Sequence, residues 1–398
     1  MQIRFKNAKF GSQGFFNSLH SLDPTQRAWI EVSGAAIREN VRLVKSLLEK
    51  DCQFMAVVKA DAYGHDAKFV SENAIRGGAQ YLGVATLKEG IFLRSEGISV
   101  PILVLGNIYK TEDLELCLKN NLMPTISSIR ECFICNNLGK KFQKKFSIHI
   151  KVDTGMSRLG FELNDFVNCF EKIIEFRNLN IDGIYSHLSS ADELNSSDDK
   201  SFANIQRIKF KKLLSKLNIK KFPNIKVHIA NSAGTLLGKN FHFDMVRIGL
   251  ALYGYNPFLN NEQINLRPAL TLKSKVSFIR EIDSNIGVSY GKKFISNRKT
   301  KLAVISIGYA DGISRQLSNK ILLMHNGNLY PQVGAITMDQ LMIDITHSQD
   351  ISIGDTVILL GSERGINLSP LDWSMKIQTI TWEILCGFNT RLPRVKTT

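Results

Sequence analysis

The chain has 398 residues, of which 44% are apolar and 22% are charged, an ordinary composition for a globular protein with two domains. No uninterrupted apolar run is long enough to span a membrane, and residues 1–23 lack the apolar core of a signal peptide. We therefore expect no membrane partner and no export.

Six cysteines are scattered through the sequence, and only Cys132 and Cys135 are closely spaced. A zinc site would need a second such pair or a Cys/His pair nearby, and none follows. Reduced thiols without a metal site are the better interpretation, which is typical of a cytoplasmic protein.

The formal net charge of +15 raises the question of nucleic-acid binding. One basic cluster lies largely in Phe202–Leu217, where apolar residues follow a helical period and the lysines are expected to face water. No RNA- or DNA-binding motif accompanies the charge. The sequence thus predicts no nucleic-acid partner.

Residues 1–24 are predicted to be a loosely ordered extension. Short apolar runs then recur at intervals of helix-plus-loop length, and we expect a strand at each of them: Phe54–Val58, Tyr81–Ala85, Ile102–Leu105, Met123–Ile126, Ser147–Val152, Ile181–Ser186, Ile225–Ala230 and Asp244–Ile248. Amphipathic stretches of helical length accompany these runs: Gly34–Leu48, Lys88–Glu96, Leu163–Phe176 and Phe202–Leu217.

Eight strands that alternate with helices predict a closed parallel (β/α)8 barrel of the TIM type, here over residues 25–262. The chemistry of such barrels gathers at the C-terminal ends of the strands. Candidate residues follow five of the eight runs: Lys59, Arg158, His187, Ser232 and Gly249 with Leu250. We expect these residues to converge on one face.

The pattern changes after about Asn260 into short β-rich segments separated by Gly, Asn and Asp turns. The segments are Ser274–Ile279, Leu302–Ile307, Ile321–Met324, Tyr330–Ile336, Met342–Ile345 and Thr356–Leu360. We expect a mainly β C-terminal domain over residues 263–398, with its boundary near Leu259–Gln263.

Lys59 is the most informative residue of the chain. It follows the apolar run Met55–Val58 and precedes the turn residue Gly64, so it lies at the mouth of a buried strand. A lysine there is either a solvated strand-end charge or a partly desolvated amine that can form a Schiff base with a carbonyl.

The string Met55-Ala-Val-Val-Lys59-Ala-Asp-Ala-Tyr63-Gly64-His65 resembles the pyridoxal-phosphate lysine motif of bacterial alanine racemases. The resemblance extends from about Arg27 to Arg394. Further strings resemble the family's motifs in the family's order: Lys151-Val-Asp-Thr-Gly-Met-Ser-Arg158-Leu-Gly160, Ser186-His187, Ala230-Asn-Ser232-Ala-Gly, Met245-Val-Arg247-Ile-Gly249, Gly287-Val-Ser-Tyr290-Gly291, Gly308-Tyr309-Ala-Asp311-Gly312 and Met338-Asp339-Gln340.

The resemblance implies proton removal from an amino-acid Cα and its return from the opposite face, with pyridoxal 5'-phosphate as the electron sink. It assigns the two bases to Lys59, which also holds the cofactor, and to Tyr290. A tyrosine base needs nearby donors or positive charge. The family supplies them through a hydrogen-bond chain that maps to His187 and Arg247. From composition alone, Tyr290 would be a half-buried strand residue and His187 a core or strand-end histidine.

Arg247 has a second implication, because an always-charged arginine should leave the pyridine nitrogen of the cofactor unprotonated. Restrained electron withdrawal then favours quick reprotonation at Cα over transamination. The alternative for Arg247 is a solvated strand-end cation, although Met245-Val-Arg-Ile-Gly249 surrounds it with apolar residues.

The cofactor phosphate is expected near the last two strands, where barrels use backbone N–H groups and helix N-termini. Ser232, the backbone of Gly249 and Leu250, and Tyr63 match the family's phosphate contacts. Ser232 could instead cap the following helix, or do both.

Other roles follow from the resemblance alone. Arg158 is expected to contact the cofactor's phenolic oxygen and the substrate carboxylate, and Lys151 occupies the place of a lysine that many members carbamylate. Met338 is expected to offer its backbone N–H to the substrate from the partner chain. Asp339 and Tyr309 are expected to line the entrance.

Two positions depart from the family's pattern. Phe388-Asn389-Thr390 precedes Arg391-Leu-Pro-Arg394 where some members have a phosphate-binding tyrosine, which puts phosphate affinity in question. Asp66 follows His65 where glycine is usual, and it brings a carboxylate to the first loop.

These observations predict a homodimeric racemase that interconverts L- and D-alanine for peptidoglycan, with Tyr290 and Met338 contributed across the interface. One rival is a racemase or decarboxylase of the same fold that acts on another amino acid. The other is a non-catalytic pyridoxal-phosphate carrier, a class of single-domain barrels without a tyrosine base.

Overall fold

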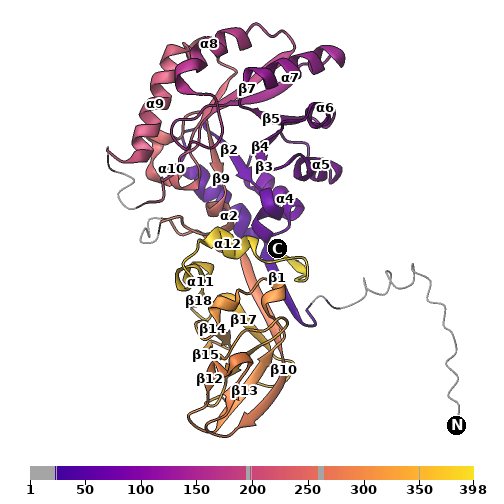
Figure 1. Ribbon diagram of the computed structural model, residues 1–398, viewed down its shortest axis with the longest axis vertical. Helices are drawn as coiled ribbons and strands as arrows, with labels where there is room; N and C mark the ends of the chain where they lie inside the picture. Colours follow the sequence, from indigo (N-terminus) through magenta and orange to yellow (C-terminus); the bar gives the residue numbers. More distant parts are fainter. Residues whose placement is uncertain (1–22, 24, 194–197, 199, 259–263, 349) are drawn as a thin grey trace, which may run out of the picture. The chain divides into compact units, whose positions relative to one another are not determined.

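The computed structural model describes residues 23, 25–193, 198, 200–258, 264–348 and 350–398. Contacts divide the chain into two compact units (Figure 1). The barrel unit comprises the described residues of Val32–Leu270 with the last three residues, and the β unit comprises the described residues up to Glu31 with those of Thr271–Val395.

The barrel unit contains the eight predicted parallel strands, in the spatial order β8-β7-β6-β5-β4-β3-β2-β9. They are β2 (Gln53–Val57), β3 (Tyr81–Val84), β4 (Ile102–Asn107), β5 (Leu122–Ile126), β6 (Phe146–Lys151), β7 (Leu179–Tyr185), β8 (Lys226–His228) and β9 (Met245–Ile248). The Arg247 N–H donates to the Ala230 carbonyl at 3.0 Å and the Asp244 N–H to the Val227 carbonyl at 2.9 Å, so hydrogen bonds join the β8 and β9 segments. The predicted parallel barrel is confirmed.

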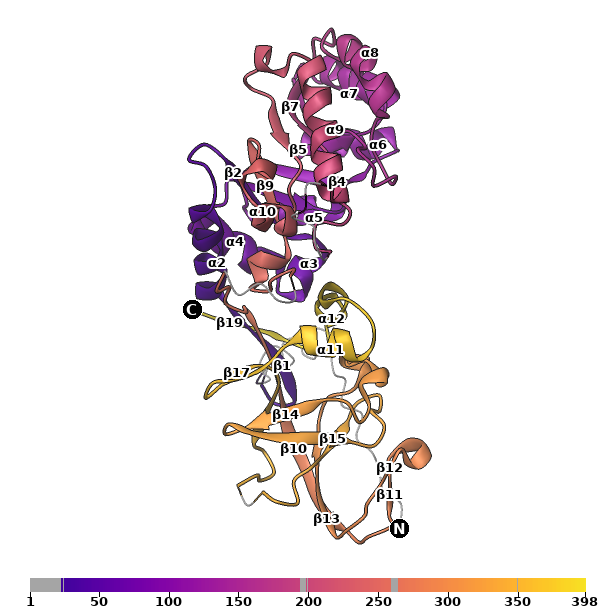
Figure 2. The same ribbon diagram turned by 90° about the vertical axis from the view of Figure 1, so that its left-hand side faces the viewer.

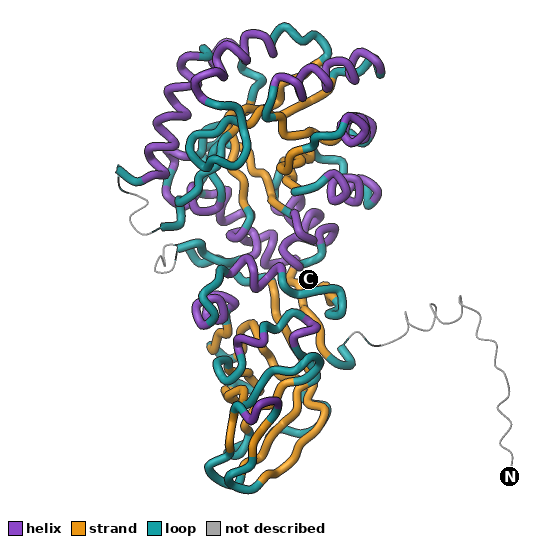
Figure 3. The backbone as a smooth tube through the Cα atoms, viewed as in Figure 1, coloured by secondary structure: helices purple, strands orange, loops and turns teal. Residues whose placement is uncertain are grey.

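Helices surround these strands, as Figure 2 and Figure 3 show. They are α2 (Gly34–Ser46), α3 (Lys59–Gly64), α4 (Ala67–Gly77), α5 (Leu87–Ser95), α6 (Thr111–Lys119), α7 (Ile129–Lys141), α8 (Leu163–Ile173), α9 (Phe202–Lys216) and α10 (Ser232–Leu237), with 3-10 turns η1 (Ile219–Lys221), η2 (Lys239–Phe241) and η3 (Leu250–Tyr253). Polar side chains fix several helix starts, since Ser33, Ser128 and Ser201 each accept a first-turn N–H.

The β unit is built on a nine-stranded sheet in the order β18-β17-β14-β15-β16-β13-β10-β1-β19. Its strands are β1 (Ala28–Ser33), β10 (Leu270–Ile282), β13 (Thr300–Ile305), β14 (Leu322–His325), β15 (Asn328–Val333), β16 (Leu341–Asp344), β17 (Thr356–Glu363), β18 (Ile366–Leu368) and β19 (Arg394–Thr397). A small hairpin of β11 (Gly287–Val288) and β12 (Phe294–Ile295), the turns η4 (Tyr290–Lys292), η5 (Tyr309–Asp311) and η6 (Arg315–Leu317), and helices α11 (Pro370–Lys376) and α12 (Thr381–Cys386) complete it. The predicted mainly β C-terminal domain is confirmed.

β1 is one of the elements that the sequence did not predict. We expected the barrel to begin at residue 25, whereas Ala28–Glu31 belongs to the β unit and pairs within its sheet. An apolar strand pattern does not reveal which sheet the strand joins. The predicted boundary at 259–263 and nearly all of the predicted extension at 1–24 lie outside the described residues, so the domain limits stay a prediction.

The six cysteines form no disulfide with one another, and burial raises the pKa of the Cys117 thiol to about 12. Across the described ranges, no helix combines the length and apolarity needed to cross a membrane. No group of three or more His, Cys, Asp or Glu side chains in the same ranges could hold a metal ion.

Asp311 anchors the β unit. Its fully buried carboxylate accepts hydrogen bonds from Arg27 at 2.9 and 2.5 Å and from the Gly308 N–H at 3.0 Å. Gly308 has no room for a side chain, because a Cβ there would lie 2.3 Å from the Thr337 carbonyl oxygen. The Gly308–Gly312 motif therefore has a structural role in this turn.

We expect Asp311→Asn to lower the thermal midpoint, because the amide leaves the Arg27 guanidinium without its anion; the loss should be about 1–3 kcal/mol. The measurement is thermal unfolding followed by circular dichroism. Glu39→Gln is the matched control, since the exposed Glu39–Arg267 pair should contribute under ~1 kcal/mol. Equal shifts in the two variants would contradict the anchoring role.

Candidate active site

A left-handed turn follows Lys59 at the C-terminal end of β2. Ala60–Tyr63 have φ between 51° and 54°, although none is glycine, and such a conformation costs about 1–2 kcal/mol per residue. The Glu89 carboxylate accepts from the N–H groups of Ala60 at 2.8 Å and Ala85 at 2.7 Å, which ties the turn to the neighbouring strand. Strain that the surroundings hold in place commonly marks a functional segment.

The turn buries Tyr63, whose ring lies 4.8 Å from that of Tyr253. Asp66 then has φ +74°, a backbone conformation that glycine adopts most readily. Its carboxylate compensates by accepting from the Phe69 N–H at 2.9 Å and pairing with Lys396 at 3.0 Å. The departure at Asp66 therefore turns a strained position into a cap for α4.

Polar groups converge after β8 and β9. The Ser232 hydroxyl accepts from the N–H groups of Gly249 at 3.0 Å and Ala251 at 3.3 Å. A Cβ at Gly249 would lie 2.7 Å from the Tyr63 hydroxyl, so that hydroxyl reaches the same backbone. The buried Leu250 N–H has no hydrogen-bond partner in the described part of the chain. Hydroxyls beside an unsatisfied buried N–H fit an anion such as a phosphate.

Ser232 is not the helix cap. The N-cap of α10 is Asn231, whose side-chain oxygen accepts from the Gly234 N–H at 2.9 Å. Ser232 is the first helical residue, and its hydroxyl is directed to the strand-end backbone instead.

Arg247 is 3% exposed and lies on β9. Its guanidinium donates to the Ser186 carbonyl at 2.9 Å and the Ile229 carbonyl at 3.0 Å, and to Nδ1 of His228 at 2.8 Å and of His187 at 3.0 Å. Burial lowers the pKa of Arg247 to about 10, so it remains a cation at neutral pH.

His187 is neutral in this environment. Burial, together with the nearby charges of Arg247 and Lys151, lowers the pKa of its imidazole well below the ordinary value. Because Arg247 can only donate, Nδ1 of His187 accepts and Nε2 carries the proton. His187 therefore presents a donor on its other side.

Lys151 is 5% exposed, with its amine 5.4 Å from the centre of the Tyr185 ring. Burial, together with the charges of Arg247, Arg158 and Lys59, lowers the pKa of this amine to about 8 against the opposing effect of Asp153. Arg158 is exposed and has no hydrogen bond or ion pair among the described residues. Four cations therefore share the mouth with little compensating negative charge, which favours anionic ligands.

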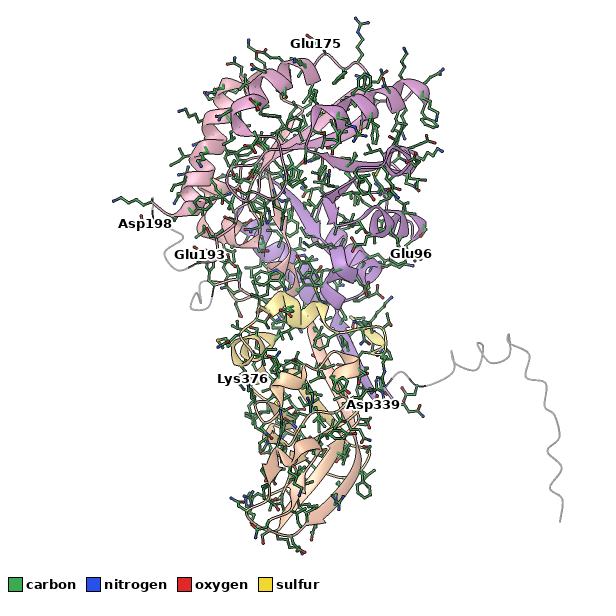
Figure 4. The ribbon with its side chains drawn as sticks, in the orientation of Figure 1. Glu96, Glu175, Glu193, Asp198, Asp339 and Lys376 are labelled. Atoms are coloured by element: carbon green, nitrogen blue, oxygen red, sulfur yellow. The ribbon has the colours of Figure 1, made fainter. Side chains whose placement is uncertain are left out.

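The remaining candidates lie in the β unit. Tyr290 is 70% exposed and Met338 is 52% exposed. The Met338 carbonyl accepts from the Ala310 N–H at 2.9 Å, while the Met338 N–H has no partner in the described chain. Tyr309 is also exposed. Asp339, which Figure 4 labels, pairs with Arg391 at 2.8 Å.

At the departure near the C-terminus, Phe388 is buried in the β unit and Asn389 donates to the Ala310 carbonyl at 2.6 Å. The replacement residues therefore support the β unit's own turns.

Several residues behind the mouth were not predicted from the sequence. Glu89 had a readable signal, because Thr86 and Glu89 form a capping box at the start of α5. The signal for His228 was weaker: it is the one polar side chain between Val227 and Ala230 in an otherwise apolar run. Gln206, fully buried on α9, donates to the His187 carbonyl at 3.0 Å and left no recognisable pattern.

The chain has the features of an enzyme that combines a parallel barrel with a β domain. The C-terminal mouth of its barrel holds a lysine, a buried arginine and an anion cradle, and a β unit follows the barrel. Family models of the alanine racemase N-terminal and C-terminal domains match residues 32–257 and 269–396. The chain belongs to the alanine racemase family.

The similarity to known alanine racemases extends over nearly the whole length of both chains. Alanine racemase of Prochlorococcus marinus is 51% identical over 378 residues, which cover 95% of this chain and 98% of the relative. A solved alanine racemase of Clostridium difficile is 33% identical with a TM-score of 0.86, covering 94% and 96% of the two chains. That of Bartonella henselae, solved with covalently bound pyridoxal phosphate, is 33% identical with a TM-score of 0.82, covering 93% and 99%.

The pKa of Lys151 gives a pH prediction. Below about pH 8 the amine is charged in both the folded and the unfolded chain, so the folded chain bears the full cost of the buried charge. Between about 8 and 10.5 only the unfolded chain holds the proton, and the cost fades as pH rises.

The gain in thermal midpoint of Lys151→Met over the unmodified chain should therefore be largest at neutral pH and shrink as pH rises through this window. The comparison is made in bicarbonate-free buffer, with the exposed Lys145→Met as control. A difference that does not change with pH would refute the depressed pKa.

Proposed function

We propose that this chain interconverts L- and D-alanine with pyridoxal 5'-phosphate bound covalently at Lys59. The observation that carries the proposal is the anion cradle of Ser232, Gly249, Leu250 and Tyr63 at the mouth that also holds Lys59. An enzyme that binds a phosphorylated aldehyde through a lysine needs both parts. A solved alanine racemase of Bacillus anthracis, 33% identical, has L-Ala-P bound, which supports an alanine substrate.

The residues of the mouth fit this cofactor. The cradle would hold its phosphate, Arg247 would face its ring nitrogen, and Arg158 would bind its phenolic oxygen and the substrate carboxylate. When bound, pyridoxal phosphate supplies the electron sink for the charge left on the substrate Cα. Because Arg247 remains a donor and a cation, it disfavours protonation of the ring nitrogen.

We assign the two proton transfers to Lys59 on one face of the substrate and Tyr290 on the other. Neutral His187 supports the second base, because its Nε2–H is available as a donor to a tyrosinate and its Nδ1 is held by Arg247. Two fixed bases remove the need for a single base to move around Cα.

We propose that the active form is a two-fold homodimer in which Tyr290 and Met338 of one subunit complete the barrel mouth of the other. The exposure of both side chains in the single chain and the unpaired Met338 N–H support this arrangement. Met338 would bind the substrate carboxylate, while Tyr309 and Asp339 would line the entrance.

Lys151 is the proposed carbamylation site. With its pKa lowered to about 8, part of the amine is neutral near neutral pH and can attack carbon dioxide. An N–C bond forms, one C=O bond becomes a C–O⁻ group, and the amine loses a proton to solvent. The resulting carbamate would pair with Arg158 and relieve the repulsion among the four cations.

Supply of D-alanine for peptidoglycan, in the cytoplasm, is the proposed biological role. Six cysteines without a disulfide between them are consistent with that compartment. No observation favours the decarboxylase. A single-domain carrier does not account for the β unit, which matches the family's C-terminal domain over 269–396.

The wild-type enzyme is expected to racemise L-alanine in preference to serine, lysine and ornithine. Lys59→Ala should lose the visible absorbance of covalently held cofactor and nearly all activity. Polarimetry across the amino-acid panel and absorption spectra provide the measurements. A borohydride-reducible cofactor linkage in Lys59→Ala would refute the assignment of Lys59 as the cofactor-binding lysine. Turnover of another amino acid in preference to alanine would refute the proposed substrate specificity.

Mixing two inactive variants tests the shared site. Lys59→Ala should be inactive for lack of its lysine, and Tyr290→Phe should bind cofactor but lose about 10²–10⁴-fold in rate. A hybrid dimer would contain one site with both bases and one with neither, so equal random mixing should restore about a quarter of the wild-type sites. Mixtures that stay inactive although hybrids form would place both bases in one chain.

A further inference from the structure

Hydrogen bonds continue from Arg247 into the barrel, away from the mouth. Arg247 Nη1 lies 2.8 Å from His228 Nδ1, and His228 Nε2 lies 2.9 Å from His149 Nδ1. Both imidazoles are fully buried. The Tyr185 ring stacks on His228 at 4.7 Å with an interplanar angle of 1°, which fixes the plane of that imidazole.

Arg247 determines the direction of this chain. A guanidinium has donors only, so Nδ1 of His228 must accept and its proton is on Nε2. His228 then donates to Nδ1 of His149, whose own proton is on Nε2. Burial and the charge of Arg247 lower the pKa of His228 well below the ordinary value, which keeps it neutral. The chain therefore ends in an N–H that faces away from the mouth.

Asp182 lies at that end. Nε2 of His149 is buried without a hydrogen-bond partner among the described residues, and Asp182 Oδ2 lies 3.7 Å from it. This distance is longer than a hydrogen bond, so the contact is between an N–H dipole and a carboxylate. Asn180 and Tyr81 hold the carboxylate at 3.2 and 3.5 Å. Burial raises the pKa of Asp182, but the contacts with His149, Asn180 and Tyr81 together outweigh burial and leave the pKa below the ordinary value.

Asp182 also lines a cavity of about 320 Å³ at the N-terminal end of the strands. Tyr81, Leu122 and Phe146, which begin or nearly begin β3, β5 and β6, form part of its wall. Its other charged groups are cationic: Arg94, Lys144 and Lys145. Arg94 donates to four backbone carbonyls. Asp182 is the single carboxylate on the lining of this cavity.

We propose that Asp182 and His149 are positioning residues for Arg247, acting from the opposite end of the barrel. The carboxylate favours the tautomer of His149 that accepts from His228, and His228 in turn keeps an acceptor toward Arg247. In the reverse tautomers two N–H groups would face each other, and Arg247 would lose a partner. The inference rests on the proposed function, because it assigns Arg247 a place beside the cofactor ring.

The first test reads the tautomers directly. In ¹⁵N-histidine spectra of the holoenzyme, His149 and His228 should both be protonated at Nε2 and bare at Nδ1, with His149 assigned through His149→Gln. Asp182→Asn should make His149 a mixture of tautomers. A wild-type enzyme with Nδ1 protonated on either histidine would overturn the proposal whatever its activity.

The second test measures the consequence at the mouth. Asp182→Asn should lower kcat roughly threefold to tenfold with KM for alanine nearly unchanged, the scale of one weak charge-assisted contact, and should shift the absorbance of bound cofactor. Lys145→Gln changes the charge of the same cavity but leaves the hydrogen bonds from Arg247 to His149 in place. Its kcat and its cofactor absorbance should match those of wild type.

Wild-type kcat and spectrum in a folded Asp182→Asn enzyme would overturn the inference alone. A wild-type chain that does not racemise alanine would overturn the proposed function, whereas the tautomers would still be tested by the spectra. The two failures are therefore distinguishable.

Discussion

The structure of the barrel mouth depends on one buried cation, Arg247, which has no carboxylate partner among the described residues. Removing a guanidinium from water is costly, and Arg247 offsets that cost with carbonyls of Ser186 and Ile229 and with two imidazoles. Each of these partners must present a lone pair, so the arginine keeps both histidines neutral and fixes their tautomers. Arg247 thereby determines which nitrogen of each histidine carries the proton.

The same shortage of negative charge is consistent with the anionic ligands that we propose for the mouth. Lys59, Lys151 and Arg158 add to the field of Arg247, and burial leaves Lys151 only weakly basic. Phosphate, substrate carboxylate and carbamate would each supply the missing anion. The strained turn after Lys59 serves the same end, because it directs the Tyr63 hydroxyl to the backbone of Gly249.

Local sequence patterns were sufficient to predict an element of the fold where one physical requirement determines its residues. Eight apolar runs predicted eight barrel strands, because a parallel strand buried on both faces must be apolar throughout. The change after Asn260 to short β-rich segments separated by Gly, Asn and Asp turns predicted the β unit, because such turns connect consecutive strands. The candidate residues came from motifs that resemble a known family, and the structure brings Tyr63, Ser232, Gly249 and Leu250 into one cradle. Their roles, and the pairing of Tyr290 with Lys59, stay proposals.

By itself, therefore, the sequence determined the architecture and the identity of the residues at the strand ends. Tertiary structure decided the contacts that join distant segments. β1 enters the β sheet although it precedes the barrel, Asn231 rather than Ser232 caps α10, and Ala60–Tyr63 turn left-handed without a glycine. The chain from Arg247 through His228 to His149 joins three strands, and its two histidines are 79 residues apart. No local periodicity encodes such a link, because its geometry exists only after the strands have closed into a barrel.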